Sequence, residues 1–164
     1  MTSEYVETSS IAGVDFKALR QIKDERGFLM EILRGSDIFK ADGKAFGQVY
    51  LSTVKPKVIK GKHLHHLQTD HMTVIRGLAA LHLEDGRENS PTKGKKEVIL
   101  MGEGHFKCVK IPPYVWHSFE NVGDEECYFI NYVTREYDRA APDEFRGPFD
   151  LKDKKMKGDP VAMG

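Results

Sequence analysis

The chain of 164 residues contains little cysteine and tryptophan and has no excess of charge of either sign. Its 25 basic residues balance 25 acidic ones, so no long-range field attracts nucleic acid or an anionic membrane, and we expect neither partner. The two cysteines, Cys108 and Cys127, give neither a disulfide framework nor the spacing of a zinc site. Both lie in strand-like runs, where small buried thiols are common.

Long apolar segments are also missing. No run reaches the roughly 18 apolar residues of a membrane span, and residues 1–10 lack the basic start and apolar core of a secretory signal. We therefore expect a soluble, cytoplasmic protein. The length suits about one domain. We predict an N-terminal extension over residues 1–15, one domain over residues 16–150 and a polar tail over residues 151–164.

Short apolar or alternating runs bounded by Gly, Pro, Asp or Asn dominate the chain. These runs span residues 16–19, 28–33, 46–54, 72–75, 78–83, 98–101, 106–111 and 128–133. Many short strands separated by turn residues predict an antiparallel barrel or sandwich. Residues 84–96 are typical of a long hairpin loop, with turn chemistry at Asp85-Gly86. Helix is expected only over residues 36–41 and 142–145.

Histidine is concentrated in one short segment. It contains His63, His65, His66, Asp70 and His71, and a further histidine, His117, follows later in the chain. Imidazole is the side chain that can act near neutral pH as base, acid or metal ligand. Residues i and i+2 share one face of a strand, so His63 and His65 are expected to point into the same space. This cluster is the predicted site of chemistry.

The spacing of these residues resembles the two sequence motifs of the cupin superfamily. The matching residues are His63, His65, Asp70 and Gly77 in the first motif, and Pro112, His117 and Asn121 in the second. Asp70 stands where glutamate is usual, and Tyr114 where glycine is usual. In a metal-binding cupin, the positions matching His63, His65, Asp70 and His117 would hold iron, manganese, nickel or zinc. The alternative is that these histidines only line the mouth of a barrel.

A longer series of segments is similar to the dTDP-4-dehydrorhamnose 3,5-epimerase family. In chain order the segments are Asp24–Glu31, Phe46–Ser52, Ile59–His63, Arg87–Thr92, Ile111–Phe119 and Tyr132–Tyr137. Their order and spacing match the family from about Phe16 to Asp150. The resemblance implies an all-β cupin jelly-roll barrel and a homodimer in which an N-terminal strand is exchanged between subunits. It also implies a nucleotide-sugar substrate and no cofactor.

The resemblance assigns a role to each matching residue. His63 would be the general base, and Tyr132 the acid on the opposite face of the sugar. The substrate-binding residues would be Arg26, Glu31 and Gln48 for the nucleotide, Lys60 for the diphosphate, and His65 and His117 in the sugar pocket. A 4-keto group acidifies the hydrogens on C3 and C5, so a base can remove one proton and a phenol can return another from the opposite side.

Two positions depart from the family pattern. Asp70 stands where the epimerases carry a lysine that steadies the enolate oxygen, and Leu81 stands where they carry an acidic residue. Because a carboxylate stabilises an adjacent enolate poorly, we expect a single epimerisation or a 3,4-ketoisomerisation of a nucleotide-linked 4-keto-6-deoxy sugar. In longer family members an aspartate near the C-terminus orients the base, and Asp150 and Asp153 are the candidates here.

Two other functions stay open from the sequence. One is a metal-dependent cupin enzyme that uses His63, His65, Asp70 and His117 as ligands, with Asp70 in place of the lysine. The other is a sugar-binding cupin without catalytic activity. Tyr132 lies in an apolar strand, where a core tyrosine with a satisfied hydroxyl is the common case.

Overall fold

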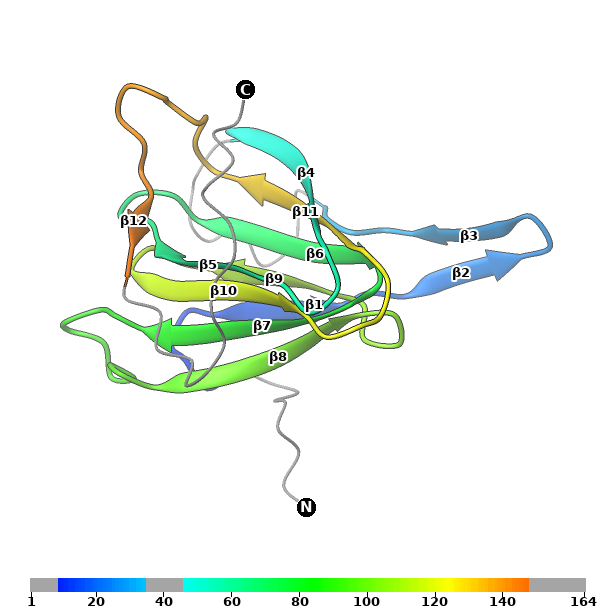
Figure 1. Cartoon of the computed structure of the whole chain (residues 1–164), viewed down its shortest axis with the longest axis horizontal. Helices are drawn as coiled ribbons and strands as arrows, with labels where there is room; N and C mark the ends of the chain where they lie inside the picture. Colours follow the sequence, from blue (N-terminus) through cyan, green and yellow to red (C-terminus); the bar gives the residue numbers. More distant parts are fainter. Residues whose placement is uncertain (1–8, 35–45, 148–164) are drawn as a thin grey trace, which may run out of the picture.

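The computed structural model describes residues 9–34 and 46–147, which form short β-strands and no helix (Figure 1). In chain order the strands are β1 (Asp15–Ala18), β2 (Gln21–Asp24), β3 (Gly27–Met30), β4 (Gln48–Val54), β5 (Ile59–Leu64), β6 (Asp70–Arg76), β7 (Leu78–Asp85), β8 (Lys96–Gly102), β9 (Lys107–Ile111), β10 (Val115–Asn121), β11 (Cys127–Val133) and β12 (Phe145–Arg146). The helix predicted over residues 142–145 is wrong, because Phe145 and Arg146 pair with β5. The helix predicted over residues 36–41 lies outside the described residues. Within the described ranges, no helix is long and apolar enough to cross a membrane.

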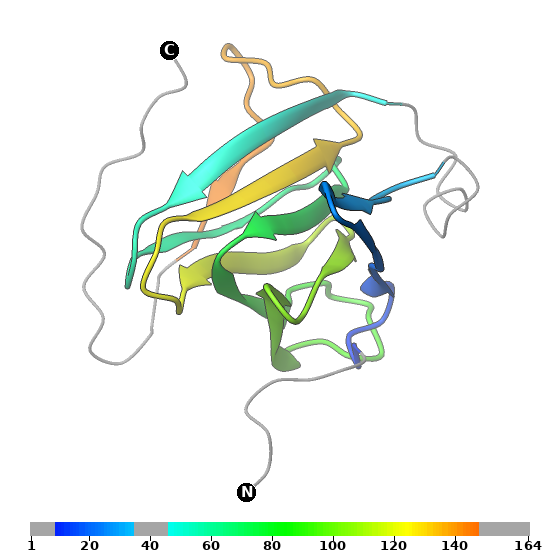
Figure 2. The ribbon, with the colours of Figure 1, turned by 90° about the vertical axis from the view of Figure 1, so that its right-hand side faces the viewer.

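Two sheets of five strands each face one another (Figures 1 and 2). One sheet has the order β1-β9-β6-β11-β4 and the other the order β12-β5-β10-β7-β8. All neighbouring strands are antiparallel, as in a double-sheet jelly roll. The remaining pair, β2 and β3, forms a hairpin that projects from the barrel (Figure 1).

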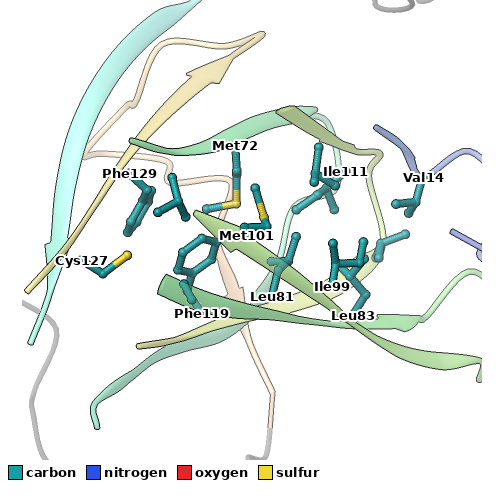
Figure 3. Close-up of a cluster of buried hydrophobic side chains, with 14 of the residues drawn as sticks. Val14, Met72, Leu81, Leu83, Ile99, Met101, Ile111, Phe119, Cys127 and Phe129 are labelled. Carbon is teal, nitrogen blue, oxygen red and sulfur yellow. The ribbon is translucent and has the colours of Figure 1, made fainter. Parts of the chain in front are cut away.

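The core lies between the two sheets, where alternate side chains of each strand meet. Met72 and Phe129 from one sheet face Leu81 and Phe119 from the other (Figure 3), and the rings of Phe119 and Phe129 lie 4.7 Å apart. Leu81, which departs from the family pattern, is therefore a core residue. Because side chains alternate along a strand, the parity of a residue decides whether it reaches the interior.

Residues before β1 also contribute to the core. Ile11 and Val14 are buried, and the backbone N–H of Ser10 donates to the Glu97 carboxylate over 3.0 Å. Part of the predicted N-terminal extension thus packs on the barrel. Residues 1–8 and the predicted tail, 151–164, lie outside the described residues, so the predicted domain boundaries stay predictions.

The loop between β7 and β8 is the long hairpin connection that the sequence predicts over residues 84–96. The carboxylate of Asp85 accepts hydrogen bonds from Arg87 Nε at 2.8 Å and from Thr92 Oγ1 at 2.6 Å. The guanidinium of Arg87 also donates to the carbonyl of Ala12. This network fixes the loop to the chain segment that precedes β1.

Candidate functional site

Three imidazoles meet inside the barrel. His63 lies near the end of β5, His65 follows that strand, and His117 lies in β10 directly opposite His63. The ring centroids of His63 and His117 are 4.3 Å apart, and His65 lies 5.2 Å from His63 and 5.4 Å from His117. One ring nitrogen from each residue lies within 4.8 Å of the others. The structure thus brings the predicted histidines together.

A register shift in β5 places Lys60 on the same side as His63. The pairing of β5 with β10 shifts after His117, so Lys60 lies opposite Phe119 while His63 lies opposite His117. Both partners face the interior, and Lys60 and His63 therefore share a face although they are three residues apart. Gly61 lies at this shift with φ of +101°, and a Cβ there would be 2.8 Å from the His117 carbonyl oxygen. Only glycine fits such a position without strain.

A buried carboxylate lies beside two of the imidazoles. Asp70 begins β6 and is 1% exposed. Its Oδ2 lies 3.2 Å from Nε2 of His65 and 3.2 Å from Nε2 of His117. Its Oδ1 accepts hydrogen bonds from Gln68 Nε2 at 2.8 Å and from Asn131 Nδ2 at 3.0 Å. The structure therefore unites Asp70 with the histidine cluster.

The charges in this cluster follow from burial and from these contacts. Burial opposes ionisation of Asp70, but the adjacent imidazoles outweigh it and hold the pKa of this carboxyl well below its usual value of 3.8. Burial alone would lower the pKa of His65, whereas its contact with Asp70 raises that pKa to about 9. Burial, together with the neighbouring His117 and His65, lowers the pKa of His63 well below 6.5. At neutral pH the site thus contains an aspartate, a protonated His65 and a neutral His63.

Backbone carbonyls orient two of the rings. Nδ1 of His117 donates to the carbonyl of Val115 over 3.0 Å, and Nδ1 of His65 donates to the carbonyl of Asp143. The Asp143 carboxylate in turn accepts the backbone N–H groups of His66, Leu67 and Gln68, each at 2.9 Å. Asp143 thereby fixes the loop that carries His65. No local sequence pattern distinguishes Asp143 from a surface aspartate, so it is not among the predicted site residues. The predicted candidates Asp150 and Asp153 lie outside the described residues.

Alternate residues of β4, Gln48, Tyr50 and Ser52, form the adjoining wall. Ser52 Oγ accepts a hydrogen bond from Lys60 Nζ over 3.1 Å, which joins the edges of the two sheets. Burial lowers the pKa of Lys60. Gln48 is half-buried, and its Oε1 accepts the backbone N–H of Tyr137 over 3.1 Å.

Tyr132 does not face this space. Its neighbour in β11, Asn131, points inward to Asp70, and side chains alternate along the strand, so Tyr132 lies on the outer face. There its ring contacts Phe46, with centroids 5.6 Å apart, and His71, at 4.9 Å. The structure therefore does not bring Tyr132 together with His63, and the predicted acid role finds no support in this arrangement.

Arg26 and Glu31 also lie apart from the histidines. Arg26 occupies the turn of the β2–β3 hairpin, its side chain is 82% exposed, and its Nε donates to Asp24 Oδ2 over 3.1 Å. Glu31 follows β3 and pairs with Lys17 at 3.8 Å and with Arg34. Within one chain, the structure brings neither residue to the barrel interior.

A family model described as the polysaccharide biosynthesis C-terminal domain matches residues 22–145. The chain belongs to this family. A probable low-salt glycan biosynthesis epimerase of Haloferax volcanii, Agl13, is 35% identical over 143 residues, which cover 86% of this chain and 90% of the relative. The spore coat polysaccharide biosynthesis protein SpsL of Bacillus subtilis is 36% identical over 140 residues, or 85% of this chain and 91% of the relative.

Solved structures give the same assignment of the fold. A dTDP sugar isomerase from Desulfovibrio desulfuricans G20 superposes with a TM-score of 0.77 at 30% identity, covering 86% of this chain and 87% of that protein. A 3'-monoepimerase from Streptomyces bikiniensis, solved in complex with dTDP-quinovose, shares the fold with a TM-score of 0.80 at 21% identity, covering 94% and 83% of the two chains. The predicted family resemblance and the predicted cupin jelly roll are confirmed.

Proposed function

We propose that the protein removes a proton next to the carbonyl of a nucleotide-linked 4-keto-6-deoxy sugar and thereby epimerises or isomerises that sugar. The predicted enzyme class, a nucleotide-sugar epimerase or isomerase, is confirmed by the family and by the epimerase and isomerase among its relatives. The observation that carries the proposed chemistry is the packing of His63 against His65 and His117 inside the barrel, with Asp70 in contact with His65 but not with His63 among the described residues.

His63 is the general base in this proposal. Its depressed pKa leaves the ring unprotonated at neutral pH and able to accept a proton from carbon. The enolate that forms needs a positive partner, and the family's lysine is replaced by Asp70. His65 supplies that charge instead, because Asp70 keeps its imidazole protonated up to a pH of about 9. His65 acts on the enolate through its charge and not through a hydrogen bond, because its Nδ1 donates to the Asp143 carbonyl and its Nε2 lies 3.2 Å from Asp70 Oδ2.

The rest of the substrate follows the family pattern. Lys60 contacts the diphosphate, and Gln48, Arg26 and Glu31 hold the nucleotide. Arg26 and Glu31 reach the barrel of a second copy in a cytoplasmic homodimer that exchanges N-terminal strands. Support for such docking comes from the apolar surface of the projecting hairpin, where Ile22, Phe28 and Leu29 are 62%, 54% and 63% exposed.

Solvent exchange tests the proposed function. The wild-type protein incubated with nucleotide 4-keto-6-deoxy sugars in deuterated water should incorporate deuterium at C3 or C5 and release an altered sugar. His63→Asn should reduce both by at least about 100-fold. His82→Asn is the matched control, because His82 lies on the outer face of β7 and contacts Glu120 at 3.0 Å. Binding of the sugar without any exchange would instead identify a sugar-binding cupin and refute the proposal.

A second candidate, a metal-dependent cupin enzyme, is favoured by the ligand-atom spacing of His63, His65 and His117. Three imidazoles with the Asp70 carboxylate would suit a divalent transition metal, which would act as a Lewis acid toward a bound carbonyl. Elemental analysis of purified protein and activity after chelation separate the two candidates. Proton-transfer chemistry predicts full activity without metal, whereas one tightly held metal per chain and loss of exchange on chelation would favour the second candidate.

A further inference from the structure

A phenol other than Tyr132 faces the site from the wall opposite His63. Tyr50 lies in β4, at the edge of one sheet, and His63 lies in β5, in the facing sheet. Tyr50 pairs directly with Asn131, whose inward orientation is fixed by its contact with Asp70. Tyr50 and Asn131 are joined by a hydrogen bond of 2.8 Å.

The hydrogen bonds of Asn131 determine whether the Tyr50 hydroxyl donates or accepts in its contact with Asn131. Asn131 Oδ1 accepts the backbone N–H of His71 over 3.1 Å, so its Nδ2 must face Tyr50 and Asp70. The two Nδ2 protons are donated to Tyr50 Oη at 2.8 Å and to Asp70 Oδ1 at 3.0 Å. Tyr50 is therefore the acceptor in its contact with Asn131. Among the described residues no acceptor for its own proton is found, so that proton is available to a bound molecule.

The surroundings of Tyr50 favour the protonated phenol. Burial and the negative charge of Asp70 raise the pKa of Tyr50 well above its usual value of 10. The hydroxyl thus stays a donor at neutral pH, where His63 is unprotonated. Tyr132, by contrast, points to the outer face of β11, where its ring contacts Phe46 and His71.

We propose that Tyr50 is the general acid of the reaction and that Asn131 positions its hydroxyl. This inference rests on the proposed function. His63 takes the proton from the carbon next to the carbonyl, and the bond electrons form an enolate. Tyr50 then donates its phenolic proton to the same carbon from the opposite face, which restores the ketone with inverted configuration. The resulting phenolate and imidazolium return to their starting states by a net transfer of one proton through solvent.

Two conservative variants, Tyr50→Phe and Tyr132→Phe, test this assignment side by side in deuterated water. Tyr50→Phe should lose inversion by at least about 100-fold and keep deuterium exchange, because His63 can remove a proton and return a deuteron on one face. Tyr132→Phe should keep both within a few-fold. Fluorinated tyrosine introduced at position 50 keeps the shape of the ring and lowers the phenol pKa, so it should retain the fold. It should move the alkaline loss of inversion to lower pH once enough fluorines bring the phenol pKa below the value of about 9 for His65.

Each outcome has one meaning. Exchange without inversion in Tyr50→Phe alone supports the assignment. Loss of inversion in Tyr132→Phe with full activity in Tyr50→Phe overturns it and returns the acid role to Tyr132, while the proposed function stands. Unchanged inversion in both variants also overturns it. Absence of exchange and turnover in the wild-type protein refutes the proposed function, and the acid role of Tyr50 with it.

Discussion

Nε2 of His65 lies 3.2 Å from Oδ2 of Asp70 in the barrel interior. A carboxylate by itself would repel an enolate, but through this contact Asp70 keeps the imidazole of His65 protonated. The pKa of His65 rises to about 9 as a result, while the pKa of His63, which lacks such a partner at this distance among the described residues, falls well below 6.5. The two rings, with centroids 5.2 Å apart, are thereby set to different protonation states at neutral pH.

The pH dependence of catalysis should reflect this difference. A base is active when unprotonated, so kcat/KM should stay constant from neutral pH down to well below pH 6.5, the usual pKa of histidine. It should fall at alkaline pH with a midpoint of about 9 as His65 loses its proton. Initial rates across pH measure both limbs. In His65→Gln the alkaline limb should disappear. An acid limb centred near pH 6.5 in the wild-type protein would contradict the lowered pKa of His63.

Replacing Asp70 by asparagine should destabilise the fold. Asp70→Asn leaves the protonated His65 buried without its counter-charge, which should lower the free energy of unfolding by about 3–5 kcal/mol. Chemical denaturation at pH 7 measures the loss. Asp124→Asn is the control, because Asp124 pairs with Lys57 at the surface and its side chain is 96% exposed. Equal stability of Asp70→Asn and wild type would show that the buried pair is not ionised.

Stability should also depend on pH through the same pair. The folded-state pKa of His65 lies above its unfolded value of 6.5, so its contribution is fully present below pH 6.5 and is lost as pH rises to about 9. The pKa of Asp70 is lowered, so its contribution is present above pH 3.8 and is lost as pH falls toward the depressed folded value. The wild-type advantage over Asp70→Asn should therefore shrink between pH 6.5 and 9. A constant advantage across that range would argue against a protonated His65.

Gly61 should tolerate no side chain. Gly61→Ala combines a φ of +101° with a Cβ only 2.8 Å from the His117 carbonyl oxygen and 2.9 Å from Ser118 Cα. Gly94→Ala is the matched control, since Gly94 has a φ of +75° and no atom within 4 Å of its added Cβ. The control should lose about 1–2 kcal/mol of stability, as expected for a left-handed residue. Gly61→Ala should lose more, and should also lose activity because β5 carries His63. Equal losses in the two variants would refute the close approach.

Lys60 should act on substrate binding and not on the chemical step. Lys60→Met removes one charge-assisted hydrogen bond to a diphosphate, worth about 1.5–3 kcal/mol, so KM should rise by about 10-fold to 100-fold while kcat changes little. Steady-state kinetics separate the two constants. Lys57→Met removes a lysine whose side chain is 66% exposed and pairs with Asp124, and it should leave KM unchanged. A selective fall in kcat for Lys60→Met would place Lys60 at the reacting ring.

Much of the fold could be predicted because strand patterning is local. Alternating and apolar runs between turn residues predict the β-strands, and the regions of β1, β4, β7 and β11 correspond to predicted runs. The strands β2 and β10 were less visible, since β2 is largely exposed and β10 mixes histidine, serine and glutamate with its core residues. The composition of residues 142–145 favours a helix, but Phe145 and Arg146 form a short strand because they pair with β5.

The proposal that His63 is the base comes from the sequence alone, because the motif around His63 and the spacing to His65 and His117 can be recognised in the linear order of residues. The family resemblance likewise predicts that Lys60 contacts the diphosphate of the substrate. The role of Asp70 could be inferred only from the tertiary structure. Next to an enolate its carboxylate would raise the energy of that anion, whereas in contact with His65 and His117 it favours the protonated form of His65.

The sequence by itself determined that this chain forms an antiparallel barrel with histidines clustered at one site, because strand alternation and motif spacing are properties of neighbouring residues. Only the tertiary structure decided which phenol faces those histidines. In a strand, a shift of one residue moves a side chain to the other face of the sheet. Asn131 thus points inward, Tyr132 points outward, and Tyr50 on the adjacent strand points toward the site.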